Sequence, residues 1–155
     1  MGICGSGKTT VGEALSKSLG IPFMDADDFH PRENVMKMSR GESLTDDDRW
    51  PWLAAIVEYI SNNHRQEFIL GCSALKESYR AYLAQRLKVH PVLLDITFEE
   101  AKARMDQRKG HFMPSSLIQS QLDTLEIPTE AIRLSATTEL DELVHLLEQN
   151  FRKLL

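Results

Sequence analysis

The chain has 155 residues, of which 42% are hydrophobic and 26% charged, and its formal net charge is −5. This composition predicts one globular domain over residues 1–155 and argues against a protein that follows the phosphates of a nucleic acid. No apolar run is long enough to span a membrane and no basic-then-apolar leader is present, so we expect a cytoplasmic protein with no membrane partner. Cys4 and Cys72 form no C-x-x-C pair, which predicts reduced thiols without a metal.

The first motif is the stretch Gly2-Ile3-Cys4-Gly5-Ser6-Gly7-Lys8-Thr9, which matches the phosphate-binding pattern G-x-x-x-x-G-K-[ST]. Glycines let the backbone turn its N–H groups inward as an anion site, and the helix that follows directs its positive end at the same phosphates. A glycine-rich turn that merely caps a helix is the alternative. We expect the phosphates of ATP to be bound by Gly2, Gly5, Ser6, Gly7, Lys8, Thr9 and Thr10.

A loop of this kind normally follows a short apolar strand, but only Met1 precedes Gly2. Without that strand, its two neighbours would keep unpaired backbone groups in the core. We therefore expect an N-terminally shortened form that folds poorly or binds ATP weakly.

Short apolar segments alternate with amphipathic ones along the rest of the chain. This alternation predicts an α/β fold with a parallel sheet covered on both faces by helices. The expected strands cover residues 21–24, 68–72, 92–96 and 132–134. The expected helices cover residues 8–19, 31–39, 46–60, 75–87, 98–105, 116–125 and 140–154.

Acidic residues follow the first of these strands, as Asp25-Ala26-Asp27-Asp28. In an extended segment Asp25 and Asp27 would point to opposite sides. The alternative to a functional role is that both residues only cap the next helix. A second acidic run, residues 46–48 after Thr45, is consistent with an ordinary helix start.

Two basic features are candidate anion contacts. Lys76 and Arg80 share one face of a predicted helix, where like charges repel, so a common anion would explain them; two solvated cations are the alternative. The stretch 108–114 is basic and contains Gly110, which is typical of a lid that closes over phosphates, with an ordinary surface loop as the alternative.

With these residues in view, the chain resembles the gluconate kinases of the small P-loop kinase type, related to shikimate and adenylate kinases. The resemblance covers nearly the whole chain, with three departures: Gly71, Ala81 and the lost first strand. It rests on residues 2–9; on 25–31 with Asn34, 37–38 and 46–53; on 72–76 with Tyr79-Arg80; and on 110–114 with Ser120-Gln121 and 124–126.

The resemblance implies a three-layer α/β/α P-loop kinase fold with acceptor-binding helices at about residues 28–62 and a mobile lid at about 108–125. It implies transfer of the γ-phosphoryl of ATP to the 6-hydroxyl of D-gluconate, with Mg²⁺ as cofactor and a homodimer as assembly. A kinase for shikimate, a nucleoside monophosphate or another sugar acid, and a nucleotide-binding regulator weakened by loss of the first strand, are the alternatives.

The catalytic candidates are Lys8, Asp27 as base or orienter of the hydroxyl, and the lid residue Arg108, with Arg104 as the second candidate for a lid arginine. Thr9 and, through water, Asp25 are the candidates for Mg²⁺. Because gluconate is a carboxylate with five hydroxyls, its pocket needs a cation and several polar groups. The substrate candidates are Asp27, His30, Asn34, Arg49, Ser73, Lys76, Arg80 and His111, and the sequence does not decide which cation meets the carboxylate.

Overall fold

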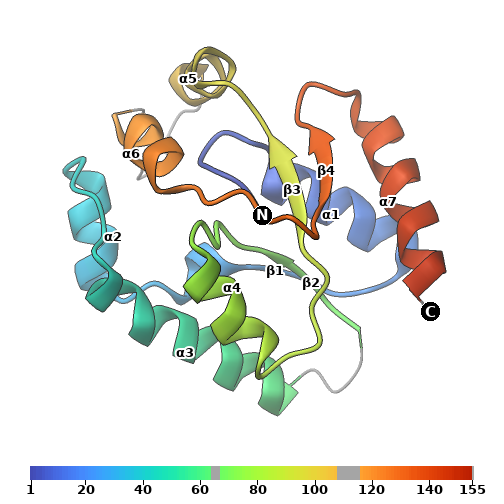
Figure 1. Ribbon diagram of the computed structural model, residues 1–155, viewed down its shortest axis with the longest axis horizontal. Coiled ribbons are helices and arrows are strands. Elements are labelled where there is room, and N and C mark those ends of the chain that lie inside the picture. The colour runs from blue at the N-terminus through green and yellow to red at the C-terminus, as the bar shows by residue number, and fades with distance from the viewer. Residues whose placement is uncertain (64–66, 108–115, 155) are drawn as a thin grey trace.

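A computed structural model describes residues 1–63, 67–107 and 116–154 (Figure 1). Strands and helices alternate as predicted. In chain order the elements are α1 (Lys8–Leu19), β1 (Phe23–Asp25), the 3₁₀ helix η1 (Ala26–Phe29), α2 (Arg32–Ser39), α3 (Asp46–Asn63), β2 (Ile69–Gly71), α4 (Glu77–Ala84), β3 (Val92–Asp95), α5 (Phe98–Gln107), α6 (Leu117–Thr124), β4 (Ile132–Ser135) and α7 (Leu140–Leu154).

The strands form two parallel pairs. β1 pairs with β2, with Met24 opposite Leu70, and β3 pairs with β4, with Leu93 opposite Arg133. Among the described residues no strand pairing joins β2 to β3, so the predicted parallel sheet consists of two halves.

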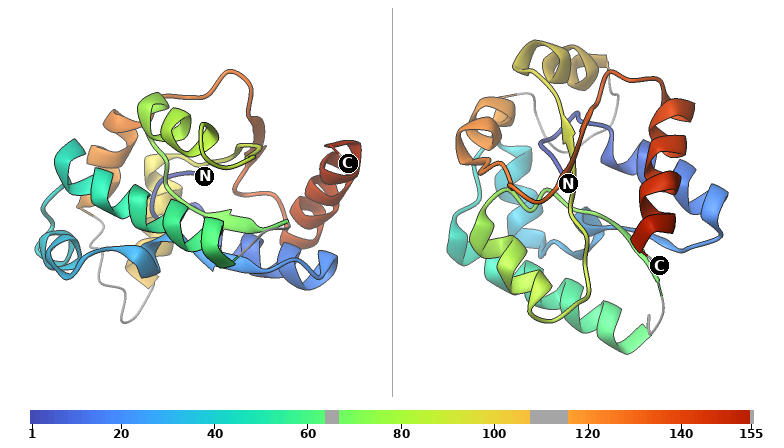
Figure 2. Two further views of the ribbon diagram at one scale, coloured as in Figure 1. Left: turned by 90° about the horizontal axis from the view of Figure 1, so that it is seen from below. Right: turned by 45° about the vertical axis from the view of Figure 1, so that its right-hand side comes forward.

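Helices cover both faces of the β1–β2 half. Alternate side chains of a strand point to opposite faces. The ring of Phe23 lies against Gly12 of α1, while Met24 is buried with residues of α3 and α4. Figure 2 shows α1 and α4 on opposite sides of β2, which confirms the three-layer arrangement.

Met1 lies beside β3, where Figure 1 marks the N-terminus. Its amine donates to Val92 O at 2.5 Å, and Leu94 N donates to Met1 O at 2.9 Å. These two bonds are those of a parallel bridge in which Met1 stands opposite Leu93. Met1 thus occupies one position of a strand between β2 and β3.

The buried core falls into two clusters. The β3–β4 cluster contains Ile3, Cys4, Val11, Met38, Leu44, Leu75, Leu94, Ile96, Ala101, Met105, Leu117, Ile118, Ala136, Leu143 and Leu147. The β1–β2 cluster contains Met24, Ala26, Trp52, Leu53, Ile56, Ile60, Cys72, Ala74, Tyr79, Leu83 and Leu87. Met1 packs against the β1–β2 cluster while its backbone bonds to β3, so it connects the two halves.

The acidic run at residues 46–48 begins α3, as the sequence indicates. Asp48 accepts from Thr45 N at 2.9 Å, and Thr45 Oγ1 accepts from Asp48 N at 3.3 Å, which satisfies two orphan donors of the helix start. Lys37 of α2 lies 2.7 Å from the same carboxylate. The Lys37 ammonium, together with the bond from Thr45, holds the pKa of Asp48 at about 2, so a charged pair joins α2 to α3.

One predicted helix is shorter than expected. The sequence predicted a helix over residues 75–87, but α4 covers Glu77–Ala84 because Ala74 has a positive φ of 44° and Lys76 is extended at the N-cap. Lys76 therefore lies outside the helical face that carries Arg80. No described helix is both long and apolar enough to cross a membrane.

Candidate active site

The phosphate-loop motif forms a tight turn that ends at the start of α1. Gly5 and Gly7 have φ values of 80° and 90°, a region that favours glycine. A Cβ on Gly5 would lie 2.9 Å from Ala101 O, so only glycine fits beneath α5. Lys8 Nζ donates to Ile3 O at 3.0 Å, which holds the ammonium across the turn. The loop thus presents backbone N–H groups and one cation together.

Asp25 connects this loop to the acidic turn after β1. Thr9 Oγ1 donates to Asp25 Oδ2 at 2.7 Å, and Asp27 N donates to Asp25 Oδ1 at 3.0 Å. The expectation that Asp25 and Asp27 point to opposite sides was wrong, because Asp27 lies in the 3₁₀ helix η1 rather than in an extended segment. Both aspartates line the same cavity.

His30 is held face to face on an indole ring. Its ring lies 4.3 Å from that of Trp52 at an interplanar angle of 13°, and Trp52 Nε1 donates to Ala26 O at 2.7 Å. Burial, assisted by the charge of Arg49, lowers the pKa of His30 from 6.5 to about 4. The imidazole is therefore neutral at physiological pH.

The neutral ring has a defined orientation. Asn34 Nδ2 lies 3.4 Å from His30 Nδ1 and donates to Asp48 O at 2.8 Å. Since an amide nitrogen only donates, Nδ1 accepts and the ring proton is on Nε2. His30 Nε2 faces Asp27 Oδ1 at 3.7 Å.

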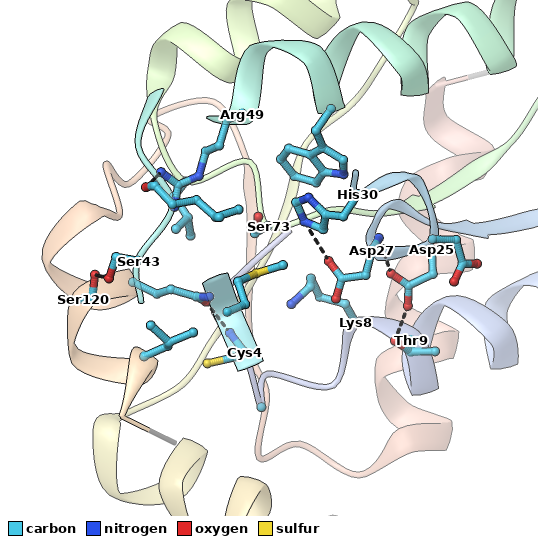
Figure 3. A pocket seen from close by; sticks show the side chains of 18 of the residues that line it. Cys4, Lys8, Thr9, Asp25, Asp27, His30, Ser43, Arg49, Ser73 and Ser120 are labelled. Atoms are coloured by element: carbon cyan, nitrogen blue, oxygen red, sulfur yellow. Dashed lines mark hydrogen bonds and ion pairs between the residues drawn. The ribbon is translucent and has the colours of Figure 1, made fainter. Parts of the chain in front are cut away.

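One cavity of about 360 Å³ joins these groups (Figure 3). Figure 3 shows Lys8, Thr9, Asp25 and Asp27 on one side and Arg49, Ser43 and Ser120 on the other. The lining residues are Cys4, Gly5, Gly7, Lys8, Thr9, Thr10, Asp25, Asp27, Asp28, His30, Met38, Ser43, Leu44, Arg49, Trp52, Ser73, Leu75, Leu117, Ser120 and Gln121.

Of the three cationic side chains predicted to bind the substrate carboxylate, Arg49 lines this cavity. Its Nη1 donates to Leu44 O at 2.5 Å and lies 3.4 Å from the hydroxyl of Tyr79, whose ring also lies under the guanidinium at 5.6 Å. A carbonyl and an aromatic ring therefore fix the guanidinium at the end of the cavity away from Thr9.

The other two cationic side chains predicted to bind substrate, Lys76 and Arg80, are each bonded to different groups of the protein. Lys76 Nζ donates to the carboxylate of Asp46 at 2.7 and 2.9 Å. Arg80 is 9% exposed and donates to the carbonyls of Ala74 and Leu75, each at 2.9 Å, and to Glu77. Neither belongs to the described lining of the cavity, and the common anion expected for the pair is not needed to explain them.

Comparison with known proteins places this geometry in a family. A family model described as shikimate kinase matches residues 4–145. A gluconokinase of Gluconobacter oxydans (strain 621H) is 42% identical over 158 residues, which cover 98% of this chain and 89% of that protein. The chain belongs to the gluconokinase family.

Further relatives agree with gluconokinase membership. The thermosensitive gluconokinase of Escherichia coli (strain K12) is 42% identical over 131 residues, covering 83% of this chain and 70% of that protein. A gluconokinase crystal structure from Sinorhizobium meliloti 1021 has a TM-score of 0.82 at 43% identity and covers 99% of this chain and 94% of that one. A shikimate kinase structure from Aquifex aeolicus vf5, with a TM-score of 0.66 at 20% identity, shows the shared fold alone. Membership in this kinase family implies use of ATP.

The predicted lid arginines of this gluconokinase-family chain fall in different parts of the structure. Arg104 of α5 donates to Gly5 O at 3.3 Å and to Ala136 O at 2.6 Å, so it braces the phosphate loop against the segment after β4. Arg108 and His111 lie outside the described residues.

Several cavity residues were not assigned a role from sequence. Gln121 of α6 accepts from Cys4 N at 2.7 Å, and Ser120 lies 2.6 Å from Ser43, oxygen to oxygen. Both contacts attach α6 to the site. Ser120 and Gln121 are among the residues on which the gluconokinase resemblance rests, so the sequence contained a signal for these two positions. Nothing local in the sequence indicates that Trp52 supports His30.

The donor set beside Thr9 fits a magnesium ion. Among the described residues no group of three His, Cys, Asp or Glu side chains could hold a metal by itself. Mg²⁺ bound with a nucleotide needs only one or two protein oxygens, since phosphates and waters supply the rest. Thr9 Oγ1 and Asp25 Oδ2 are two such oxygens, 2.7 Å apart.

Proposed function

We propose that this chain transfers the γ-phosphoryl of ATP to the 6-hydroxyl of D-gluconate, producing 6-phospho-D-gluconate and ADP. The observation that carries this proposal is the single cavity with a phosphate loop at one end and Asp27, His30 and Arg49 further along it. The relatives named gluconokinase, about 42% identical, support gluconate as the acceptor.

The phosphate loop supplies the ATP end of the reaction. Phosphoryl transfer passes through a loose transition state, so the protein mainly positions the reactants and stabilises charge on the transferring oxygens. The loop N–H groups and Lys8 bind the β- and γ-phosphates in this role. Thr9 and, through water, Asp25 would hold Mg²⁺, which when bound offsets the negative charge of the phosphates.

Asp27 orients the acceptor hydroxyl and takes its proton. The bond that forms joins the 6-oxygen of gluconate to the γ-phosphorus, and the bond that breaks joins that phosphorus to the oxygen retained by ADP. The proton of the hydroxyl goes to the carboxylate of Asp27. His30, neutral and protonated on Nε2, is a hydrogen-bond donor next to this carboxylate at 3.7 Å.

Arg49 binds the carboxylate of gluconate at the other end of the cavity. Both of its hydrogen bonds described above involve Nη1, and a guanidinium carries further donors on Nη2 and Nε that suit a planar carboxylate. The hydroxyls of the sugar acid meet the polar lining between Arg49 and Asp27, namely Ser43, Ser73, Ser120 and Gln121.

Other predictions stay as proposals. We infer that Arg108 acts from a lid formed by residues 108–125, with Arg104 bracing the loop, and that His111 contacts substrate. We also propose a cytoplasmic enzyme, where ATP is available, and a homodimer.

A coupled ADP-release assay with gluconate, shikimate and other sugar acids tests the proposal. We expect release that depends on gluconate and is lost by at least about 100-fold in Asp27→Asn, with ATP affinity retained, because the amide keeps the shape but not the base. The matched control is Asp47→Asn, an exposed position on α3 away from the cavity. ADP release that ignores the acceptor, or that prefers another acid, would reject gluconate kinase activity.

A further inference from the structure

Asn34 of α2 connects the start of α3 to the acceptor end of the cavity. The sequence suggested it as a contact for a substrate hydroxyl, but its side chain is 3% exposed and lies outside the described lining of the cavity. Its Nδ2 donates to Asp48 O at 2.8 Å and lies 3.4 Å from His30 Nδ1. The amide nitrogen therefore serves two acceptors of the protein itself.

The orientation of the Asn34 amide follows from the group that it faces. A backbone carbonyl accepts hydrogen bonds and cannot donate them, so the amide atom beside Asp48 O is the nitrogen and not the oxygen. That nitrogen carries two hydrogens, and the second is available to His30 Nδ1. Asp48 is itself held by Lys37 and Thr45, which gives the amide a fixed support. Asn34 thus leaves the ring proton of His30 on Nε2.

With the proton on Nε2, His30 and Asp27 present a donor and an acceptor side by side. Nε2 lies 3.7 Å from Asp27 Oδ1, and both side chains line the cavity (Figure 3). One hydroxyl oxygen can lie at an ordinary hydrogen-bond distance of about 2.8 Å from both atoms. A hydroxyl both donates and accepts, so it can give its proton to Asp27 and accept from His30. The opposite tautomer would present two acceptors to the hydroxyl, which has one proton to donate.

The surroundings of His30 keep the ring neutral. Burial makes the largest contribution to its lowered pKa of about 4, followed by the charge of Arg49 of α3, while Asp25 of β1 acts in the opposite direction. Trp52 of α3 stacks on the ring, and Asp27 of η1 faces its Nε2. The ring therefore holds one proton at neutral pH, and the group beside Nδ1 helps to decide which nitrogen carries it.

We propose that Asn34 is a positioning residue of the kinase reaction, which keeps the ring proton of His30 on Nε2 so that His30 and Asp27 together hold the acceptor hydroxyl. This inference rests on the proposed function of Asp27. Asparagine suits the position because its nitrogen donates to two acceptors at once, one at the start of α3 and one in the ring. Aspartate has the same shape, but its ionised oxygens cannot donate, so Asn34→Asp should draw a proton to Nδ1.

Nitrogen NMR of the ring measures the position of the proton. The protein is labelled with ¹⁵N at its histidines, and the signals of His30 are those absent from His30→Phe. A ring nitrogen without a proton resonates far from one with a proton, so spectra at pH 7 distinguish the two tautomers. We expect the native chain to carry the proton on Nε2 and Asn34→Asp to carry one on Nδ1, whether the ring then holds one proton or two. The matched control is Asn62→Asp, the same change at an exposed position of α3 outside the described cavity lining.

Turnover shows whether the position of this proton matters for the reaction. In Asn34→Asp we expect kcat for gluconate-dependent ADP release to fall by at least about tenfold while the KM for ATP changes by less than about twofold, because the acceptor hydroxyl alone loses a contact. Asn62→Asp should keep the native kcat. If Asn34→Asp does not fold, Asn34→Leu replaces it, since leucine is similar in size and cannot donate. It should move the Nδ1 signal toward that of an unbonded nitrogen and should lower kcat in the same way.

Three results would overturn the proposal. They are a proton on Nδ1 in the native chain, a Nδ1 signal that no variant at position 34 changes, and a kcat within about twofold of the native value in a variant whose Nδ1 signal has changed. The spectra need neither ATP nor gluconate, so they test the support of His30 independently of the kinase proposal. A native chain without gluconate-dependent ADP release would instead reject that proposal, and with it the catalytic part of this inference.

Discussion

His30 makes the stability of this protein depend on pH in a predictable direction. The unfolded chain binds a proton at an ordinary pKa of 6.5, whereas the buried imidazole binds it only near pH 4. Between these values the unfolded state holds more protons, so the free energy of unfolding falls as the pH is lowered through this window. Arg49 favours the neutral ring, while Asp25 acts in the opposite direction, and Asp27 faces Nε2.

The size of the effect follows from the two pKa values. Lowering the pH from 7 to 5 should cost about 2 kcal/mol of stability through His30 alone, out of about 3 kcal/mol when the ring is fully protonated in both states. The variant His30→Phe keeps an aromatic ring on Trp52 but cannot titrate. It should therefore lack this part of the pH dependence, whatever its stability at pH 7.

Urea unfolding followed by tryptophan fluorescence measures the effect, because Trp50 and Trp52 both belong to α3 and Trp52 stacks on His30. The quantity compared is the loss of unfolding free energy between pH 7 and pH 5 in the two proteins, in which the remaining carboxylates cancel. We expect the native chain to lose about 2 kcal/mol more than His30→Phe. A difference below about 0.5 kcal/mol would mean that the folded ring accepts a proton almost as readily as the unfolded one, and the reasoning would fail.

Three further changes test the site and its scaffold. Lys8→Ala should lower kcat by about 100-fold, measured in steady-state turnover, since it removes a cation on the transferring phosphoryl; a loss below threefold would contradict that role. Arg49→Met should raise the KM for gluconate by about 10- to 100-fold with the KM for ATP little changed, and a larger effect on ATP would move Arg49 to the nucleotide. Gly12→Ala should destabilise the fold by about 1–3 kcal/mol in urea unfolding, because the new Cβ would lie 2.2 Å from the ring of Phe23. The double variant with Phe23→Leu should recover part of this loss, and no recovery would place the strain elsewhere.

The local features of the site were readable from the sequence. The glycine spacing predicted the phosphate turn, and the alternation of apolar segments predicted the order of strands and helices, because both depend on neighbours in the chain. Thr45 and Asp48 likewise predicted the start of α3, since a helix cap needs residues only three positions apart.

The features that sequence reasoning missed depend on contacts across the fold. Asp27 lies in a 3₁₀ helix, in which Asp25 accepts its N–H. No rule of residue spacing distinguishes this turn from an extended strand. Lys76 pairs with Asp46, thirty residues away, rather than with a ligand shared with Arg80. The support of His30 by Trp52 is likewise a tertiary contact between distant segments.

The division of the core also bears on how the protein loses its structure on heating. Ile3 and Cys4 of the phosphate loop are buried in the β3–β4 cluster, whereas Ala26 and Trp52, which support the acceptor residues, are buried in the β1–β2 cluster. Packing also connects the two clusters, because α1 contacts β1 and β2 as well as α7, and the consecutive residues Ala74 and Leu75 belong to different clusters. A change that loosens either cluster is therefore expected to lower the midpoint of one cooperative transition, in which the nucleotide end and the acceptor end of the cavity are lost together.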